Sequence, residues 1–486
     1  MIAPQTSSLP SVGGATTVAT MAGYFALLAA ISIWAARRTK TSADFFVAGR
    51  QMGTVVLGIA AMATTLTGFT FIAGPGLFYS VGATALFIVL PASLTNTLGA
   101  WTLAGPLHRL GRDHGVITIP GAIGVRYNSR AAQGWAAAGI LVAVIGYIAT
   151  NFLALGFVLD AVFGTGLTAG IWIGAAVMFA YTAAGGMLAG MYADVFQGIV
   201  KAVASVAACV LAIKAGGGLG EISSTILARD PEYLSPFGKG GALMALSYFF
   251  VFGVGSLGQP HVAHKYLMAR DLREFRWYPL VMTGGMTLAL LIYLTVGLAV
   301  KAMVVRGEIA PLAVSEQAMS VFLEKVVPPA LAGVVFAGIT SAIMSAVNAF
   351  LSVGSAAIMH DLPKAFGRSS ADELRSGRWA TIGLAVAAAL VAQLPGAQVV
   401  FLGVFAYGLF ASTLIPALAI GLNWQRGTAT AAIASIATGL LVTVIGESLQ
   451  FAHVYSLPAG VPWSGVALVL SLLVYVTLSV AAPRAR

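Results

Sequence analysis

Apolar residues occur in long runs along the whole chain, separated by short polar segments. A run of about 20 residues crosses the roughly 30 Å hydrocarbon core of a membrane as a helix, at a rise of about 1.5 Å per residue. Strands of a membrane barrel would instead alternate apolar and polar residues over about 10 positions. We therefore predict thirteen helical spans, near residues 17–36, 53–80, 83–107, 134–162, 166–187, 190–213, 241–259, 277–303, 328–359, 377–394, 397–422, 427–446 and 463–482.

The composition supports an integral membrane protein. Of the 486 residues, 59% are hydrophobic and only 9% are charged, with a mean hydropathy of +0.92, whereas soluble domains carry about 25% charged residues. No polar segment is long enough for a separate soluble domain, so we expect one transmembrane domain over residues 1–486. The first run lacks a cleavage site, which predicts a retained helix and not a signal peptide.

The basic residues are distributed unevenly between alternate loops. One set of loops holds 19 of the 26 Lys and Arg residues, which by the positive-inside rule predicts an N-terminus outside and a C-terminus in the cytoplasm. We expect a multi-pass protein of the plasma (bacterial inner) membrane. The formal net charge of +10 then follows from topology, so a nucleic-acid partner is not expected.

Two of the predicted spans contain residues that interrupt helices. In residues 58–82, threonines surround Gly68 and a GPG sequence follows, while in residues 242–261 three glycines precede Gln259 and Pro260. Such segments can unwind and offer backbone carbonyls to a ligand. Because these are the second and seventh spans, the pattern favours an inverted-repeat secondary transporter with its site between the breaks. Gly and Pro are also frequent in ordinary membrane helices, which leaves that alternative open.

Other functional classes fit less well. The chain has no Walker loop for an ATP-driven pump, too few polar residues for a continuous pore and no converging catalytic groups, so we expect neither an enzyme nor a cofactor beyond a coupling ion. His261 and His264 lack a third ligand, and we interpret them as part of a polar cytoplasmic loop. A membrane sensor that binds a solute without transporting it stays open as an alternative.

Five segments along the chain carry a family resemblance: ADFFVAGRQMG (43–53), GGMLAGMYADVFQG (185–198), GQPHVAHKYLMARD (258–271), residues 339–362 and residues 405–439. In this order they resemble the sodium/solute symporter family, and the resemblance covers nearly the whole chain. It implies a leucine-transporter-like fold of five plus five inverted-repeat helices over residues 53–422, with an extra helix at 17–36 and two C-terminal helices within 427–482. It also implies cation-coupled uptake of a small organic solute by a monomer in the bilayer, with Na+ the usual ion.

The resemblance also implies a cation site where the first broken helix meets the eighth core helix. A Na+ ion there needs about five neutral oxygens in place of its water, and one expected hydroxyl is missing because Ala346 stands where a Ser or Thr is usual. The matching ligands are the carbonyls of Ala63, Leu66 and Ala342 and the hydroxyl of Ser345.

Two charged residues share one predicted helix on the implied cation path. Asp194 matches a family aspartate on the cytoplasmic exit route, which in some members helps to hold a further Na+, and Asn348 is a candidate to assist it. Lys201 lies seven residues later, about 10 Å along the same face, where relatives are typically apolar. At mid-membrane each charge costs about 2.5–3.5 kcal/mol. Lys201 is therefore a structural lysine, a proton-carrying ammonium that replaces Na+, or a partner for a substrate carboxylate.

The substrate is expected to bind between the two breaks. A proline permease has a tyrosine where this chain has Ser256, and the rich polar set that a sugar needs is absent. We therefore expect a small, mostly apolar solute with one anionic group, such as a short monocarboxylate or an amino acid. The candidate substrate residues are Thr67, Thr70, Phe71, Phe252, Ser256 and Gln259.

Overall fold

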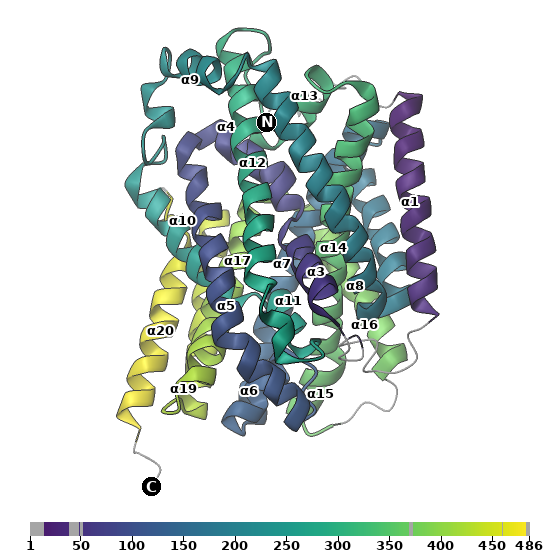
Figure 1. Cartoon of the computed structure of the whole chain (residues 1–486). Coiled ribbons are helices and arrows are strands. Elements are labelled where there is room, and N and C mark those ends of the chain that lie inside the picture. Colours follow the sequence, from purple (N-terminus) through teal and green to yellow (C-terminus); the bar gives the residue numbers. More distant parts are fainter. Residues whose placement is uncertain (1–13, 38–47, 49–51, 369–372, 459, 483–486) are drawn as a thin grey trace.

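Long helices that run roughly side by side make up the computed structural model of the chain (Figure 1). It describes residues 14–37, 48, 52–368, 373–458 and 460–482. Within these residues, nine helical segments are long and apolar enough to cross a membrane, and four shorter apolar helices accompany them. The all-helical membrane class is confirmed, but the number of thirteen spans is not.

The principal helices follow the predicted apolar runs. Two groups of predicted residues fall outside the described part of the chain. They are most of the segment at 43–53 and all of the basic residues Arg38, Lys40, Arg50, Arg484 and Arg486. The helices are α1 (Ala15–Ala36), α3 (Thr54–Thr65), α4 (Gly74–Val81), α5 (Leu86–Asp113), α6 (Ile119–Tyr127), α7 (Arg130–Phe163), α8 (Leu167–Ala215), α9 (Leu219–Leu227), α10 (Gly241–Gly255), α12 (Tyr278–Val305), α13 (Ala318–Lys325), α14 (Pro329–Ala356), α15 (Leu362–Ala365), α16 (Glu373–Ala392), α17 (Val399–Ile415), α19 (Ala429–Phe451) and α20 (Trp463–Ala481).

One long helix, α8, covers two of the predicted spans. The spans expected at 166–187 and 190–213 lie in a single helix of 49 residues, about 74 Å long at 1.5 Å per residue. The predicted break between these two spans is therefore wrong, because the backbone stays helical across it. The sequence there has small residues but no proline, so nothing removes a backbone donor and forces the helix to end.

The first predicted helix break lies at Leu66–Gly68. Helix α3 ends at Thr65, Leu66 is extended (φ −85°, ψ 97°), and the chain resumes as the π-helical turn η2 (Phe69–Ala73) before α4. The GPG sequence at 74–76 is helical. A Cβ on Gly74 would lie 2.4 Å from the Tyr293 ring, so that glycine permits close packing and does not unwind the helix.

The second predicted break is centred on Gln259. Helix α10 is followed by the 3₁₀ turn η5 (Ser256–Gly258), and Gln259 is extended (φ −71°, ψ 107°). Pro260 then begins the short helix α11 (Pro260–Ala263), where its missing N–H costs no intrahelical bond. Both interruptions expected from the sequence are thus confirmed.

The polar loop expected at His261 and His264 is wrong. Both side chains are buried, because the chain continues from α11 into the 3₁₀ turn η6 (His264–Leu267) and packs into the bundle. The His261 ring lies 4.4 Å from the Phe350 ring, and His264 Nε2 lies 2.8 Å from the Ile117 carbonyl oxygen.

The segments next to the two breaks are joined at one end of the bundle. Met52 N donates to the carbonyl of Met268 (3.2 Å), and Arg270 N donates to the carbonyl of Met52 (3.1 Å). The Thr54 N–H, at the start of α3, donates to Glu274 Oε2 at 2.6 Å. These bonds tie α3 to the chain that follows the second break.

Small residues let α8 approach both α3 and α14. A Cβ on Gly198 of α8 would lie 2.9 Å from Ile59 of α3, and a Cβ on Gly338 of α14 would lie 2.2 Å from Ala204 of α8. The three backbones are therefore close around the break at Leu66, which lets a side chain of α8 reach both neighbouring helices.

Candidate cation and substrate site

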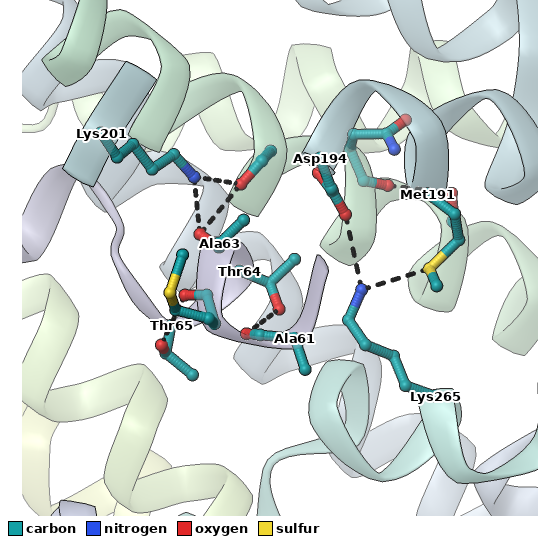
Figure 2. Close-up of polar contacts among 12 residues, drawn as sticks. Ala61, Ala63, Thr64, Thr65, Met191, Asp194, Lys201 and Lys265 are labelled. Atoms are coloured by element: carbon teal, nitrogen blue, oxygen red, sulfur yellow. Dashed lines mark hydrogen bonds and ion pairs between the residues drawn. The ribbon is translucent and has the colours of Figure 1, made fainter. Parts of the chain in front are cut away.

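The ammonium of Lys201 lies between two oxygens of the predicted cation site (Figure 2). Its Nζ donates to the Ala63 carbonyl at the end of α3 and to the Ser345 hydroxyl on α14, both at 2.6 Å. Ser345 Oγ in turn donates to the same Ala63 carbonyl at 3.1 Å. Lys201 is fully buried, so its positive charge sits where α3, α8 and α14 meet.

The other predicted cation ligands flank this contact. Leu66 is the extended residue after α3, and Ala342 lies one turn before Ser345 in α14. Both are fully buried, as is Ala346 beside Ser345. The hydrogen bonds of Lys201 are to Ala63 and Ser345, so the structure joins two of the four predicted ligands to the ammonium.

A charged Lys201 and a Na+ ion exclude one another from this position. An ion bound to the same oxygens would lie about 3 Å from Nζ, where two unit charges repel by about 5 kcal/mol at an effective dielectric constant of about 20. Within the described residues, no carboxylate forms an ion pair with Lys201. The nearby Asp194 pairs with another lysine instead.

A second buried lysine, Lys265, pairs with Asp194 (Figure 2). Lys265 Nζ lies 3.4 Å from Asp194 Oδ2 and 3.6 Å from Met191 Sδ, and the two charged side chains are 1% and 2% exposed. Lys265 belongs to η6 after the second break. Lys265 is one of the 19 basic residues that the charge pattern predicts in the cytoplasmic loops, and this prediction is wrong because its side chain is buried; its place in the segment GQPHVAHK was a signal that it belongs to the core.

Asn348 packs beside this pair without sharing its bond. Its Nδ2 would lie 2.1 Å from a Cβ on Gly190 of α8, so the amide fits against a glycine about one turn before Asp194. Across the described residues, the ion-pair partner of Asp194 is Lys265. The predicted assistance of Asn348 to Asp194 stays a prediction.

The Asp194–Lys265 pair predicts a strong double-mutant coupling. Asp194→Asn or Lys265→Met alone leaves one buried charge unpaired, which costs about 3–5 kcal/mol, so each variant should unfold at a lower temperature than wild type in detergent. Because the double variant removes both charges, it should recover most of that loss. Lys325→Gln, at an exposed side chain that pairs with Glu324, should cost less than about 1 kcal/mol. Additive losses in the double variant would contradict the pairing.

The first break is held open by Asn151 of α7, which the sequence analysis did not single out. Gly68 N donates to Asn151 Oδ1 at 3.0 Å, and Asn151 Nδ2 donates to the Tyr147 carbonyl at 2.8 Å. An amide in the middle of the mostly apolar run at 134–162 was the available signal. Thr70 Oγ1 accepts from Thr67 N at 3.2 Å, so that hydroxyl supports the unwound backbone too.

The predicted substrate residues lie buried at the two breaks. Thr67, Thr70 and Phe71 are buried at the first break, and Phe252, Ser256 and Gln259 are buried at the second. The Phe69 and Phe252 rings bring the two sides together, with centroids 6.0 Å apart. Gln259 Nε2 donates to the Gly255 carbonyl at 3.2 Å, while its buried Oε1 has no hydrogen-bond partner among the described residues.

Tyr407 of α17 supplies the phenol that Ser256 lacks. Its hydroxyl lies 2.7 Å from Ser256 Oγ, and its ring stacks on Phe252 with centroids 4.5 Å apart. Sequence reasoning missed this residue, although it lies in the quoted segment at 405–439. The hydroxyl and the aromatic wall therefore come from two different helices.

Tyr407→Phe is expected to weaken solute binding while the protein stays folded. The ring keeps its stacking on Phe252, but Ser256 loses its hydroxyl partner, which is worth about 1 kcal/mol and corresponds to a roughly five-fold higher KM. Initial rates of uptake against solute concentration measure this. Tyr455→Phe, at an exposed position, is the matched control, and an unchanged KM in Tyr407→Phe would remove this residue from the site.

Solved structures share this architecture. A Na+-coupled sialic acid symporter, described in a substrate-bound outward-open state, superposes with a TM-score of 0.79 at 17% identity, covering 97% of this chain and 99% of that one. Mhp1, a nucleobase-cation-symport-1 family transporter, superposes with a TM-score of 0.59 at 15% identity, covering 91% and 94%. These likenesses establish the fold, which is the leucine-transporter-like fold predicted above.

Sequence comparison identifies the family. The chain is 27% identical to the sodium/pantothenate symporter of Escherichia coli over 443 residues, which cover 89% of this chain and 91% of the relative. It is 26% identical to the high-affinity proline transporter PutP of Bacillus subtilis, covering 85% and 89%. The profile of the sodium:solute symporter family matches residues 45–439, most of the chain. The protein is therefore a member of the sodium:solute symporter family.

Proposed function

We propose that the protein is a secondary transporter that takes up a small organic anion or amino acid together with a proton, with Lys201 in place of a bound Na+. The observation that carries the proposal is the position of Lys201 Nζ, 2.6 Å from both the Ala63 carbonyl and the Ser345 hydroxyl. These are two of the oxygens expected to bind the cation.

A protonated Lys201 can hold α3 and α14 together, as a bound ion would. Its ammonium joins the end of α3 to α14, and charged hydrogen bonds of this kind are worth about 1.5–3 kcal/mol each. A neutral amine has no charge and one donor fewer, so loss of the proton loosens α3 from α14. No carboxylate among the described residues holds the ammonium in an ion pair that would oppose this release.

Two further residues favour a carrier that does not need Na+. Ala346 provides no second hydroxyl for an ion, and Lys265 places another ammonium on Asp194, the residue expected to guide or hold a further cation. Both expected cation positions are thus next to a fixed positive charge, which repels a second cation.

The side chains at the two breaks favour a solute with one small polar end. Phe69, Phe252 and Tyr407 form an apolar wall, and Ser256 and Gln259 add a hydroxyl and an amide. The names of the relatives mention proline and pantothenate, and each of these molecules carries one carboxylate. This supports a monocarboxylate or an amino acid as the solute. Membrane orientation, with the N-terminus outside, and action as a monomer remain part of the proposal.

Na+-coupled uptake of the same solutes is the second candidate, favoured by the sodium named in the pantothenate relative and in the family. In that case Lys201 would have to leave Ala63 and Ser345 when the ion binds. The two candidates make opposite predictions for transport in choline buffer, where no Na+ is present.

Counterflow in proteoliposomes tests the transporter and its substrate class together. Vesicles loaded with one unlabelled solute are placed in trace labelled solute, using a panel of short monocarboxylates, proline, pantothenate and glucose. We expect saturable exchange of a carboxylate solute at equal rates in choline and Na+ buffers. Exchange of glucose alone would refute the substrate class, a strict Na+ requirement would favour the second candidate, and saturable binding without any exchange would indicate a sensor.

A further inference from the structure

A polar cavity of about 620 Å³ is lined by residues of α6, of α15 and of the start of α7. Helices α6 and α15 lie at one end of the bundle (Figure 1). The cavity lining is rich in groups that attract anions: Arg130 and Lys364 are exposed cations, and His114 and His360 add two imidazoles. The carboxyl of Asp361, next to the lining residue His360, is fully buried, where it accepts hydrogen bonds from Thr118 Oγ1 (2.7 Å) and Gln133 Nε2 (2.8 Å).

An apolar groove of about 590 Å³ adjoins this cavity and shares Arg130 with it. The groove runs along α7 from Arg130 to Ala138, a distance of about 12 Å at 1.5 Å per residue, and α15 forms its other wall. Helices α7 and α15 lie close together here, since a Cβ on Gly134 would lie 3.0 Å from Ala365. Trp135 is 37% exposed and Phe366 is 79% exposed at its edges.

The depth of the groove matches the boundary between headgroups and acyl chains. Helix α7 has 34 residues, about 51 Å, which exceeds the roughly 30 Å hydrocarbon core. The apolar run predicted at 134–162 leaves Arg130 outside the hydrocarbon core and places Ala138 inside it. Tryptophan is enriched at this boundary, and basic pockets between membrane helices suit anionic lipid headgroups.

We propose that the cavity and groove together bind one anionic glycerophospholipid. Its phosphate lies against Arg130 and Lys364, and one acyl chain follows α7 between Trp135 and Phe366. Charge complementarity selects an anionic over a zwitterionic headgroup, because the described lining offers cations and no accessible carboxylate. The apolar groove selects a lipid over free phosphate, which would leave that surface empty. The proposal concerns a site remote from Lys201 and does not depend on the transported solute.

Native mass spectrometry of the full chain, with phosphatidylglycerol or phosphatidylcholine added to the detergent, tests the site. We expect one tightly retained phosphatidylglycerol and no comparable retention of phosphatidylcholine. Arg130→Gln with Lys364→Gln removes two cations, so retention should fall by about 30-fold. Arg273→Gln with Lys325→Gln, two exposed residues outside the cavity, should leave retention unchanged. Equal melting temperatures of the two double variants exclude misfolding as the cause.

A substitution in the groove separates lipid from free phosphate. Ala138→Phe fills the acyl path without touching the cations, and it should weaken phosphatidylglycerol retention. Competition by glycerol 3-phosphate as strong as that by phosphatidylglycerol, with no effect of Ala138→Phe, would overturn the lipid proposal in favour of a phosphate site. Equal retention of phosphatidylcholine, or unchanged retention after loss of Arg130 and Lys364, would also overturn it.

Discussion

Lys201→Met is expected to lower proton-driven accumulation of solute by about 100-fold or more. The substitution removes two charged hydrogen bonds, to Ala63 and Ser345, each worth about 1.5–3 kcal/mol, and every 1.4 kcal/mol is a factor of about ten. Methionine keeps an unbranched apolar stem, so the packing of α8 is largely preserved. The measurement is the initial uptake rate in Na+-free proteoliposomes under an inward proton gradient.

Lys214→Met is the matched control, because it makes the same substitution at an exposed position in the last turn of α8. It should accumulate solute at the wild-type rate. Solute exchange at equal pH on both sides shows whether Lys201→Met still binds and moves its substrate. Wild-type accumulation by Lys201→Met, or a Na+ requirement that survives Lys201→Ala with unchanged affinity, would remove Lys201 from the coupling mechanism.

The double variant Lys201→Ala and Ala346→Ser is expected to make uptake depend on Na+. It removes the ammonium and adds the missing hydroxyl next to Ser345, so the carbonyls of Ala63, Leu66 and Ala342 and two hydroxyls can surround one ion. We expect Na+ to raise the uptake rate by about ten-fold or more, equivalent to about 1.4 kcal/mol of coupling.

The two single variants identify the cause of that effect. Ala346→Ser alone keeps the ammonium, which repels Na+ from the same oxygens, and Lys201→Ala alone lacks one hydroxyl. Neither should respond to Na+ as strongly as the double variant. A double variant that exchanges solute but ignores Na+ would show that the two residues are not complementary.

The parts of the site that sequence could predict depend on local patterns. The breaks at Leu66–Gly68 and Gln259 follow from glycine and proline, which act on the backbone where they stand. Lys201 was conspicuous because a charge in an apolar helix is costly. Its proximity to Ala63 and Ser345 was reached only through the resemblance of the chain to a family of known fold.

The missed residues act through partners far away in the chain. Asn151 is 83 residues from Gly68, Tyr407 is 151 from Ser256, and Lys265 is 71 from Asp194. Hydropathy places each of them in a span or a loop, but which side chains meet depends on how the helices pack. Lys265 shows the consequence, since an apparent loop charge is buried and paired.

Hydropathy alone also could not predict the number of helices. An apolar run states how much chain can enter a membrane, and it does not locate the end of a helix. The run at 166–213 forms the single helix α8, while the predicted span at 53–80 divides into α3, η2 and α4. Helix ends depend on the backbone N–H donors and on how the helices pack. The predicted spans took neither into account.

Proton movement coupled to solute entry tests the central claim most directly. The protein is reconstituted with a pH-sensitive dye inside the vesicles, in buffer without Na+, and a transported carboxylate solute is added outside. The account predicts acidification of the interior that saturates with solute, is present in wild type and Lys214→Met, and is absent in Lys201→Met. Solute entry without acidification, occurring only when Na+ is added, would contradict it.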